Sequence, residues 1–143
     1  MSGNITLTMI KPVAYSKNVS GKILARITEA GFWLVAARTM QLSLVQAKKF
    51  YSVHQDRPFF NDLVEFMSSG PILVAMIQKD NAVEDYRLLI GKTNPAEAAD
   101  GTIRHDFGTN LQANAVHGSD SDENAIIECD FFFSKSERFY RPG

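Results

Sequence analysis

The chain has 143 residues, of which 45% are hydrophobic and 22% are charged, and its formal net charge is −1 at pH 7. These values fit one globular domain over residues 1–143, and the mixed charge is unlike the basic surface of a nucleic-acid-binding domain. No apolar stretch reaches the roughly 20 residues of a membrane-spanning helix, and the single cysteine, Cys129, excludes an internal disulfide. We therefore expect a cytoplasmic protein with no membrane partner.

The first part of the chain predicts two strands that flank a helix. Residues 5–10 alternate apolar and polar side chains, which is typical of a strand. Apolar residues then recur at helical spacing over residues 16–30, and Gly31 follows as a typical helix stop. Residues 32–42 are rich in apolar and β-branched side chains and predict the second strand.

The middle of the chain predicts a pair of helices, then a strand and another helix. A serine followed three residues later by glutamine is a capping-box sequence, which predicts a helix over residues 43–54. A proline opens a shorter helix over residues 58–69. Residues 71–78 are almost continuously apolar and predict a buried strand, and residues 81–90 predict a helix that ends at a glycine.

The last part predicts a long loop, an edge strand and a final helix. Residues 92–112 have turn signals and no clear period, and loops of this length in compact domains are usually functional. Residues 113–116 predict a short edge strand, and Asp120 with Glu123 predicts the cap of a helix that runs to about residue 133. The order contains the β-α-β-β-α-β core of a ferredoxin-like α+β sandwich. We therefore expect a four-stranded antiparallel sheet covered by helices, with an inserted helix pair.

The segment most typical of a reactive site is Asn-Ala-Val-His-Gly-Ser-Asp-Ser-Asp over residues 114–122. His117 stands just before a capped helix start, where free backbone N–H groups favour phosphate. A neutral imidazole is also a competent nucleophile near pH 7. Taken alone, this spacing fits an ordinary loop histidine beside a helix cap more often than a catalytic one. Glu128 follows on the predicted helix, at a spacing that does not guarantee contact with His117.

Cationic and aromatic residues offer a second indication. Lys11, Arg87 and Arg104 are candidates for a polyphosphate clamp, because guanidinium groups bind phosphate through two hydrogen bonds, although single surface cations are more often only solvated. Phe60 fits the apolar face of its predicted helix, so Phe59 lies off that face and is a candidate platform on which a base could stack. Packing of both phenylalanine rings in the core is an equal alternative. The histidines and the cysteine lack metal-ligand spacing, so no protein-built metal site is expected.

Several segments together resemble the nucleoside diphosphate kinase family. The stretch from Asn114 to Ser121, with its His-Gly-Ser-Asp-Ser core, is similar to the active-site signature of that family. Six further segments occur in the family's order and at its usual spacing: residues 10–12, 56–60, 63–64, 67–71, 91–96 and 101–104. The resemblance covers essentially the whole chain, with a short C-terminus as in the bacterial branch. It outweighs the commoner explanations of each single segment.

The resemblance implies a reaction and a set of roles. The γ-phosphate of a nucleoside triphosphate, typically ATP, would pass to a nucleoside diphosphate by a ping-pong mechanism through phosphorylated His117, which maintains nucleotide pools. Ser119 and Glu128 would orient this histidine, and Tyr51 would pack beside it. The implied nucleotide contacts are Arg87, Thr93 and Arg104 on the phosphates, Lys11 and Asn114 on the ribose, and Phe59 and Leu111 on the base, with Lys11 also near the transferred phosphate. Mg²⁺ would accompany the nucleotide, and the protein would form a tetramer or hexamer.

The sequence departs from the family pattern at few positions. Val13 stands where the family usually has Asp or Asn, so a helix cap worth about 1 kcal/mol is lost unless Ser16 replaces it. His105 is also unusual, and its position beside Arg104 allows an effect on phosphate binding.

Two other functions fit the same fold. The first is a binding or regulatory relative without activity, which loss of the nucleophile would indicate, but His117 is present. The second is a nucleic-acid module, since ferredoxin-like sheets often bind RNA. The near-neutral charge and the lack of clustered basic and aromatic residues argue against nucleic acid.

Overall fold

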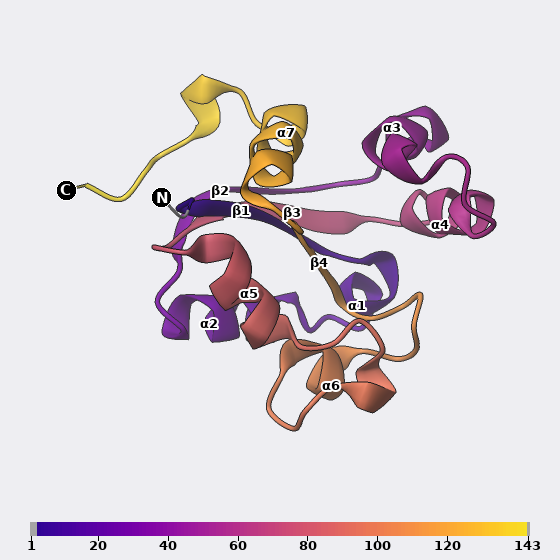
Figure 1. Cartoon of the computed structure of the whole chain (residues 1–143), viewed down its shortest axis with the longest axis horizontal. Coiled ribbons are helices and arrows are strands. Elements are labelled where there is room, and N and C mark those ends of the chain that lie inside the picture. The colour runs from indigo at the N-terminus through magenta and orange to yellow at the C-terminus, as the bar shows by residue number, and fades with distance from the viewer. Residues whose placement is uncertain (1–2, 143) are drawn as a thin grey trace.

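A four-stranded antiparallel sheet forms the centre of the computed structural model, which describes residues 3–142 (Figure 1). Met1, Ser2 and Gly143, at the two ends of the predicted domain, lie outside the described residues. The strands have the order β2-β3-β1-β4, and every neighbouring pair is antiparallel. Their bounds are Ile5–Ile10 for β1, Trp33–Met40 for β2, Ile72–Gln78 for β3 and Val116–Gly118 for β4. The predicted ferredoxin-like fold is confirmed.

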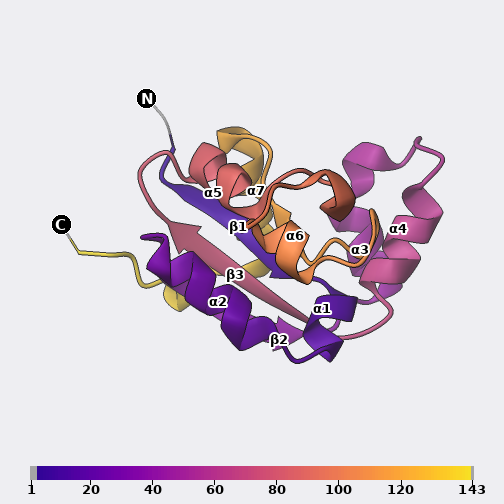
Figure 2. The ribbon, with the colours of Figure 1, turned by 90° about the horizontal axis from the view of Figure 1, so that it is seen from below.

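Helices cover both faces of this sheet. Figure 2 shows α2 (Ser20–Glu29) and α5 (Ala82–Ile90) on one face, and Figure 1 shows α7 (Asp122–Phe132) on the other. The inserted pair, α3 (Leu44–Phe50) and α4 (Phe60–Met67), lies at one end of the sheet. None of the helices described over residues 3–142 is long and apolar enough to cross a membrane.

Two apolar clusters hold the layers together, one on each face of the sheet. Leu7 and Met9 of β1 belong to the cluster under α3, α4 and α7, whereas Ile10 belongs to the cluster over α2 and α5. The alternation of a strand sends successive side chains to opposite faces, so β1 contributes to both clusters. This double burial places β1 at the centre of the molecule, where it supports β4 beside it.

The helix predicted over residues 16–30 is wrong at its start. The chain instead forms a short helix, α1 (Pro12–Ser16), and α2 begins only at Ser20, because Asn18 between them has a positive φ of 61°. Val13 lies inside α1, and Ser16 donates a hydrogen bond to the Val13 carbonyl at 2.8 Å. Ser16 therefore does not replace the missing cap.

The predicted loop over residues 92–112 also contains regular structure. It holds a 3₁₀ turn at Pro95–Glu97 and a helix, α6 (Ile103–Phe107), each started by a side-chain cap. Such short elements have too few residues to show a period, so the sequence pattern missed them. The capping box of α3 is present as predicted, but that helix ends at Phe50 and a 3₁₀ turn over Ser52–His54 follows.

The edge strand and the last helix begin later than predicted. Residues 113–116 overlap β4 only at Val116, because Ala115 has a positive φ of 75° that breaks an extended strand. The cap of α7 is Ser121, whose Oγ accepts from the Asn124 backbone N–H at 3.1 Å. Asp120 instead accepts from the Asn124 side chain, so the predicted cap was one residue early.

Candidate active site

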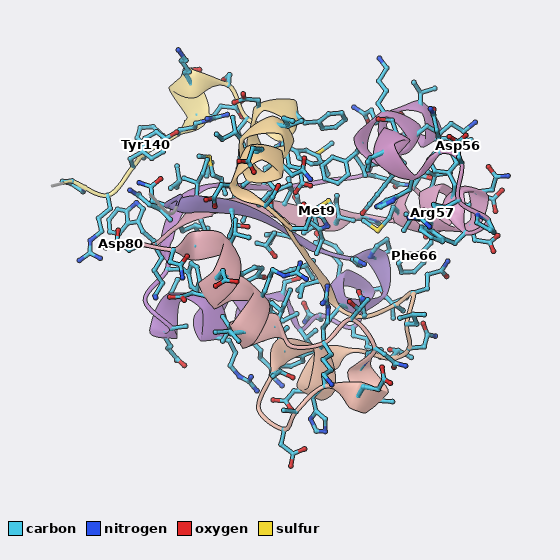
Figure 3. The ribbon with its side chains drawn as sticks, in the orientation of Figure 1. Met9, Asp56, Arg57, Phe66, Asp80 and Tyr140 are labelled. Carbon is cyan, nitrogen blue, oxygen red and sulfur yellow. The ribbon has the colours of Figure 1, made fainter. Side chains whose placement is uncertain are left out.

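His117 lies on β4 directly opposite Met9 of β1, on the sheet face covered by α7. Figure 3 labels Met9, which marks this position between α7 and the α3–α4 pair. Helix α7 turns back over the strand and brings Glu128 Oε1 to 2.8 Å from His117 Nε2. The contact that the sequence spacing left open is therefore made. Because a carboxylate accepts hydrogen bonds, Nε2 is the donor in this contact, and in the neutral ring the lone pair then lies on Nδ1.

Ser119 fixes the carboxylate that holds the histidine. Its Oγ donates to Glu128 Oε1 at 2.8 Å and accepts from the Leu7 backbone N–H at 3.1 Å. Ser119 is fully buried, and Leu7 is part of the central strand. The hydrogen bonds thus run from the sheet backbone through Ser119 and Glu128 to the imidazole, which restricts its orientation.

Two aromatic rings complete the wall around His117. Tyr51 lines a pocket of about 420 Å³ together with His117 and Glu128. The Phe50 ring meets the His117 ring edge-on, with 5.5 Å between centroids. No motif in the sequence singles out Phe50, although it directly precedes Tyr51. Within residues 3–142 the buried Tyr51 Oη has no hydrogen-bond partner. Burial, reinforced by the charge of Glu128, raises the pKa of Tyr51 well above its usual range, so its O–H remains a donor.

A second pocket, of about 970 Å³, lies between α5 and the 92–112 loop, and Arg87, Thr93, Arg104 and Leu111 are among its lining residues. Arg104 donates from Nη1 to the Gly91 carbonyl at 3.1 Å and from Nη2 to the Val116 carbonyl at 3.0 Å. The second bond ties the loop to β4, next to His117. Burial, with the charge of Arg87, lowers the pKa of Arg104 to about 10.

Lys11 and Asn114 both lie next to Ala115, just before β4. The Lys11 backbone N–H donates to the Ala115 carbonyl at 2.8 Å, so Lys11 runs beside the segment that leads into β4. Its side chain is buried, and burial together with the charge of Arg104 lowers the pKa of Lys11 to about 7. Asn114 donates to the Thr93 carbonyl at 3.0 Å, and its buried Oδ1 has no partner in the described chain. This oxygen is therefore available to accept a hydrogen bond from a ligand.

The base-binding candidates lie at the outer rim. Phe59 is 49% exposed and Leu111 is 59% exposed. Phe60 packs against the core while Phe59 is exposed, so of the two alternatives the structure has Phe59 off the apolar face and not the core packing of both rings. Leu111 lines the larger pocket, whereas Phe59 does not. Gln112, beside Leu111, donates a hydrogen bond to the Asp62 carbonyl of α4 at 3.3 Å. The loop and α4 therefore approach each other at the rim.

The sequence matches one family over nearly its whole length. The profile described as "Nucleoside diphosphate kinase" matches residues 4–138. The nucleoside diphosphate kinase of Flavobacterium psychrophilum is 55% identical over 139 residues, which are 97% of this chain and 100% of the relative. That of Campylobacter curvus is 57% identical over 132 residues, which are 92% of this chain and 96% of the relative.

Solved structures agree with the sequence comparison. The nucleoside diphosphate kinase of Aquifex aeolicus matches with a TM-score of 0.93 at 43% identity, over 94% of this chain and 98% of that one. The halophilic enzyme of Halobacterium salinarum, solved in complex with CDP, matches with a TM-score of 0.92 at 33% identity, over 97% and 93%. By its sequence and its fold, with a histidine on the edge strand β4 held by Glu128, the chain belongs to the nucleoside diphosphate kinase family.

Proposed function

We propose that residues 1–143 act as one domain that moves the γ-phosphate of a nucleoside triphosphate, typically ATP, to a nucleoside diphosphate through Nδ1 of His117. The observation that carries this proposal is the 2.8 Å contact between His117 Nε2 and Glu128 Oε1. It commits one ring nitrogen to the carboxylate and leaves the other as the nucleophile. One site serves donor and acceptor in turn, so the kinetics are ping-pong.

The two half-reactions are mirror images. In the first, the Nδ1 lone pair forms a bond to the γ-phosphorus, and the bond from that phosphorus to the bridging oxygen breaks, which releases the diphosphate. In the second, a terminal oxygen of the acceptor diphosphate attacks the phosphohistidine, and Nδ1 recovers its lone pair. Glu128 stabilises the positive charge that develops on the ring while the nitrogen–phosphorus bond exists.

Fixed donors of this chain bind the phosphates. Arg87, Arg104 and Thr93 line one pocket, which supports their assignment to the polyphosphate. Lys11 would bind near the transferred group, where phosphate charge restores the protonated amine that burial disfavours. The unpartnered Tyr51 hydroxyl supplies a further donor beside His117.

The sugar and the base would lie further out. The Oδ1 of Asn114, which has no partner among the described residues, is suited to accept a hydrogen bond from a ribose hydroxyl, and the Lys11 amine is suited to donate one. The base would stack on Phe59, with Leu111 opposite, because both are exposed at the rim. Every base has a π-face, so base tolerance is expected to be broad. The CDP bound to the Halobacterium relative supports a nucleotide as the ligand.

Mg²⁺ fits this site as a companion of the nucleotide. Over residues 3–142 there is no group of three or more His, Cys, Asp or Glu side chains placed to hold a metal. Nucleotide phosphates would therefore supply its oxygen ligands, in line with the preference of Mg²⁺ for phosphate and water. When bound, the ion neutralises phosphate charge, and the residues of the chain itself position the nucleotide.

We also infer a homo-oligomer, a tetramer or a hexamer, that works in the cytoplasm. Trp33 and Leu34 on the edge strand β2 support self-association, because both are large apolar side chains that are exposed to solvent. Cys129 is a free thiol, which supports a reducing compartment. Light scattering at several concentrations would give the number of subunits.

The position of the phosphate tests the assignment of the nucleophile. Protein phosphorylated by ATP and Mg²⁺ is unfolded in alkali, and ³¹P NMR then distinguishes the two phosphohistidine isomers. The proposal requires the Nδ1 isomer. An Nε2 phosphohistidine would contradict it, because that nitrogen would then have to leave Glu128.

A further inference from the structure

Arg26 of α2 makes three contacts with the loop that carries Arg104. Its Nη1 donates to the Gly101 carbonyl at 2.9 Å, its Nη2 pairs with the Asp106 carboxylate, and its guanidinium lies 5.4 Å from the centre of the Phe107 ring. These contacts lie on both sides of Arg104 in sequence. Figures 1 and 2 show α2 and α6 on the same side of the sheet. Arg26 is thus one anchor of this part of the loop on the body of the protein, beside the buried Ile103.

The loop needs such an anchor. Helix α6 has five residues, which is too short to be stable alone in water. Its cap, Thr102, reaches the His105 N–H at only 3.4 Å. The guanidinium of Arg104 must nevertheless stay aligned between the Gly91 and Val116 carbonyls. External contacts therefore decide how well Arg104 is held.

His105 extends the same cluster. Its Nδ1 lies 2.9 Å from Asp106 Oδ1, and its Nε2 lies 3.1 Å from Asp100 Oδ1. A neutral imidazole has one N–H, so only one of the two carboxylates can receive a hydrogen bond from it. The imidazolium ion has two and satisfies both. The geometry around His105 therefore suits its protonated form.

We propose that Arg26 and His105 are positioning residues that latch residues 100–107 onto α2 and so set the strength with which Arg104 binds nucleotide phosphate. The latch is complete when His105 is protonated. This proposal rests on the proposed contact between Arg104 and phosphate, because a loop that did not touch the nucleotide could not change its binding.

Protonation of His105 gives the latch its pH dependence. The charged groups facing His105 are Asp106 and Asp100 from its own segment, with Arg26 of α2 on the other side of Asp106. The hydrogen bond to Asp106, and then the charge of Asp100, raise the pKa of His105 above its usual value of 6.5. A raised pKa means that the added stability is complete below pH 6.5 and is lost as the pH rises through the higher value.

The test compares KM for a nucleoside diphosphate and kcat in wild-type protein, Arg26→Gln and His105→Asn at pH 6 and pH 8.5. Arg26→Gln should raise KM about threefold or more at both pH values, with kcat within about twofold. His105→Asn should raise KM about twofold at pH 6 and leave it at the wild-type value at pH 8.5. Dividing the KM of each variant by the KM of wild type at the same pH cancels the effects of titration of the nucleotide and of Lys11.

Arg38→Gln is a matched control. Arg38 makes the same three kinds of contact as Arg26: it pairs with a carboxylate, donates to a backbone carbonyl and lies over a phenylalanine ring. Its partners, Glu137, Phe132 and Phe133, belong to the C-terminal part of the chain and not to the loop that carries Arg104. Its side chain is 38% exposed, close to the 33% of Arg26. Unchanged KM in this control supports the latch. An equal rise in KM for both arginine variants, or a His105→Asn effect that does not vary with pH, overturns it.

The variant Arg104→Gln distinguishes a failure of the latch from a failure of the proposed contact between Arg104 and phosphate. If Arg104→Gln raises KM and Arg26→Gln does not, the latch is wrong while the proposed phosphate contact stands. If Arg104→Gln leaves KM unchanged, the phosphate contact fails and the latch fails with it.

Discussion

The buried amine of Lys11 should make the free protein less stable than it would be with an apolar residue. Burial and the charge of Arg104 hold the pKa of Lys11 at about 7, against 10.5 for an exposed lysine. The amine makes its proposed contact only when a nucleotide is bound. Replacing Lys11 with methionine, which has a similar length and no charge, should therefore abolish activity and stabilise the protein.

The magnitude follows from the two pKa values. Below pH 7 the amine is charged in both the folded and the unfolded chain. The shift of its pKa from 10.5 to about 7 then corresponds to a penalty of ~5 kcal/mol in the folded state. Between pH 7 and 10.5 the unfolded chain binds more protons, so the stability of the wild type rises with pH. At pH 9 the remaining penalty is ~2 kcal/mol.

Chemical denaturation at a fixed protein concentration measures this directly. Lys11→Met should exceed wild type in free energy of unfolding by ~5 kcal/mol at pH 6 and by ~2 kcal/mol at pH 9. A difference in the free energy of unfolding that becomes smaller at higher pH is characteristic of the amine, because a packing effect would not depend on pH. A variant less stable than wild type at pH 6, or a gap that stays constant, would refute the reasoning.

Three other substitutions probe the site. Glu128→Gln should lower kcat by about 10²-fold in steady-state assays, because the amide cannot stabilise the imidazole charge; unchanged kcat would contradict the role of the carboxylate. Phe59→Ala should weaken binding of purine and pyrimidine diphosphates alike, by about 1–3 kcal/mol, and a loss confined to one base would disprove general stacking. Gly118→Ala should lower the free energy of unfolding by about 1–3 kcal/mol, because the new Cβ would lie 3.0 Å from Tyr86; a denaturation midpoint equal to that of wild type would argue against this.

The sheet was predictable from sequence because its strands carry strong apolar patterns. Residues 5–10 and 71–78 predict β1 and β3 almost to the residue, since both strands are buried and bounded by proline or glycine signals. Two of the failures share one physical cause, an unusual backbone angle that no side-chain period reveals. Positive φ at Asn18 splits one predicted helix, and positive φ at Ala115 delays β4.

The sequence proposes candidate residues for the site but not their geometry. The His-Gly-Ser-Asp-Ser stretch indicates His117, yet contact with Glu128 depends on the angle at which α7 returns over the sheet. Tertiary packing sets that angle. The pKa of Lys11 likewise depends on burial, which sequence neighbours do not determine.

The most direct test of the proposed mechanism is a two-step label transfer. The protein is incubated with γ-labelled ATP and Mg²⁺, freed of nucleotide and then given UDP alone, with His117→Ala beside it. The phosphohistidine mechanism predicts that wild type takes up an acid-labile label and passes it to UDP, whereas the variant does neither. Folded wild-type protein that captures no label, or a His117→Ala variant that still transfers it, would contradict the phosphohistidine mechanism.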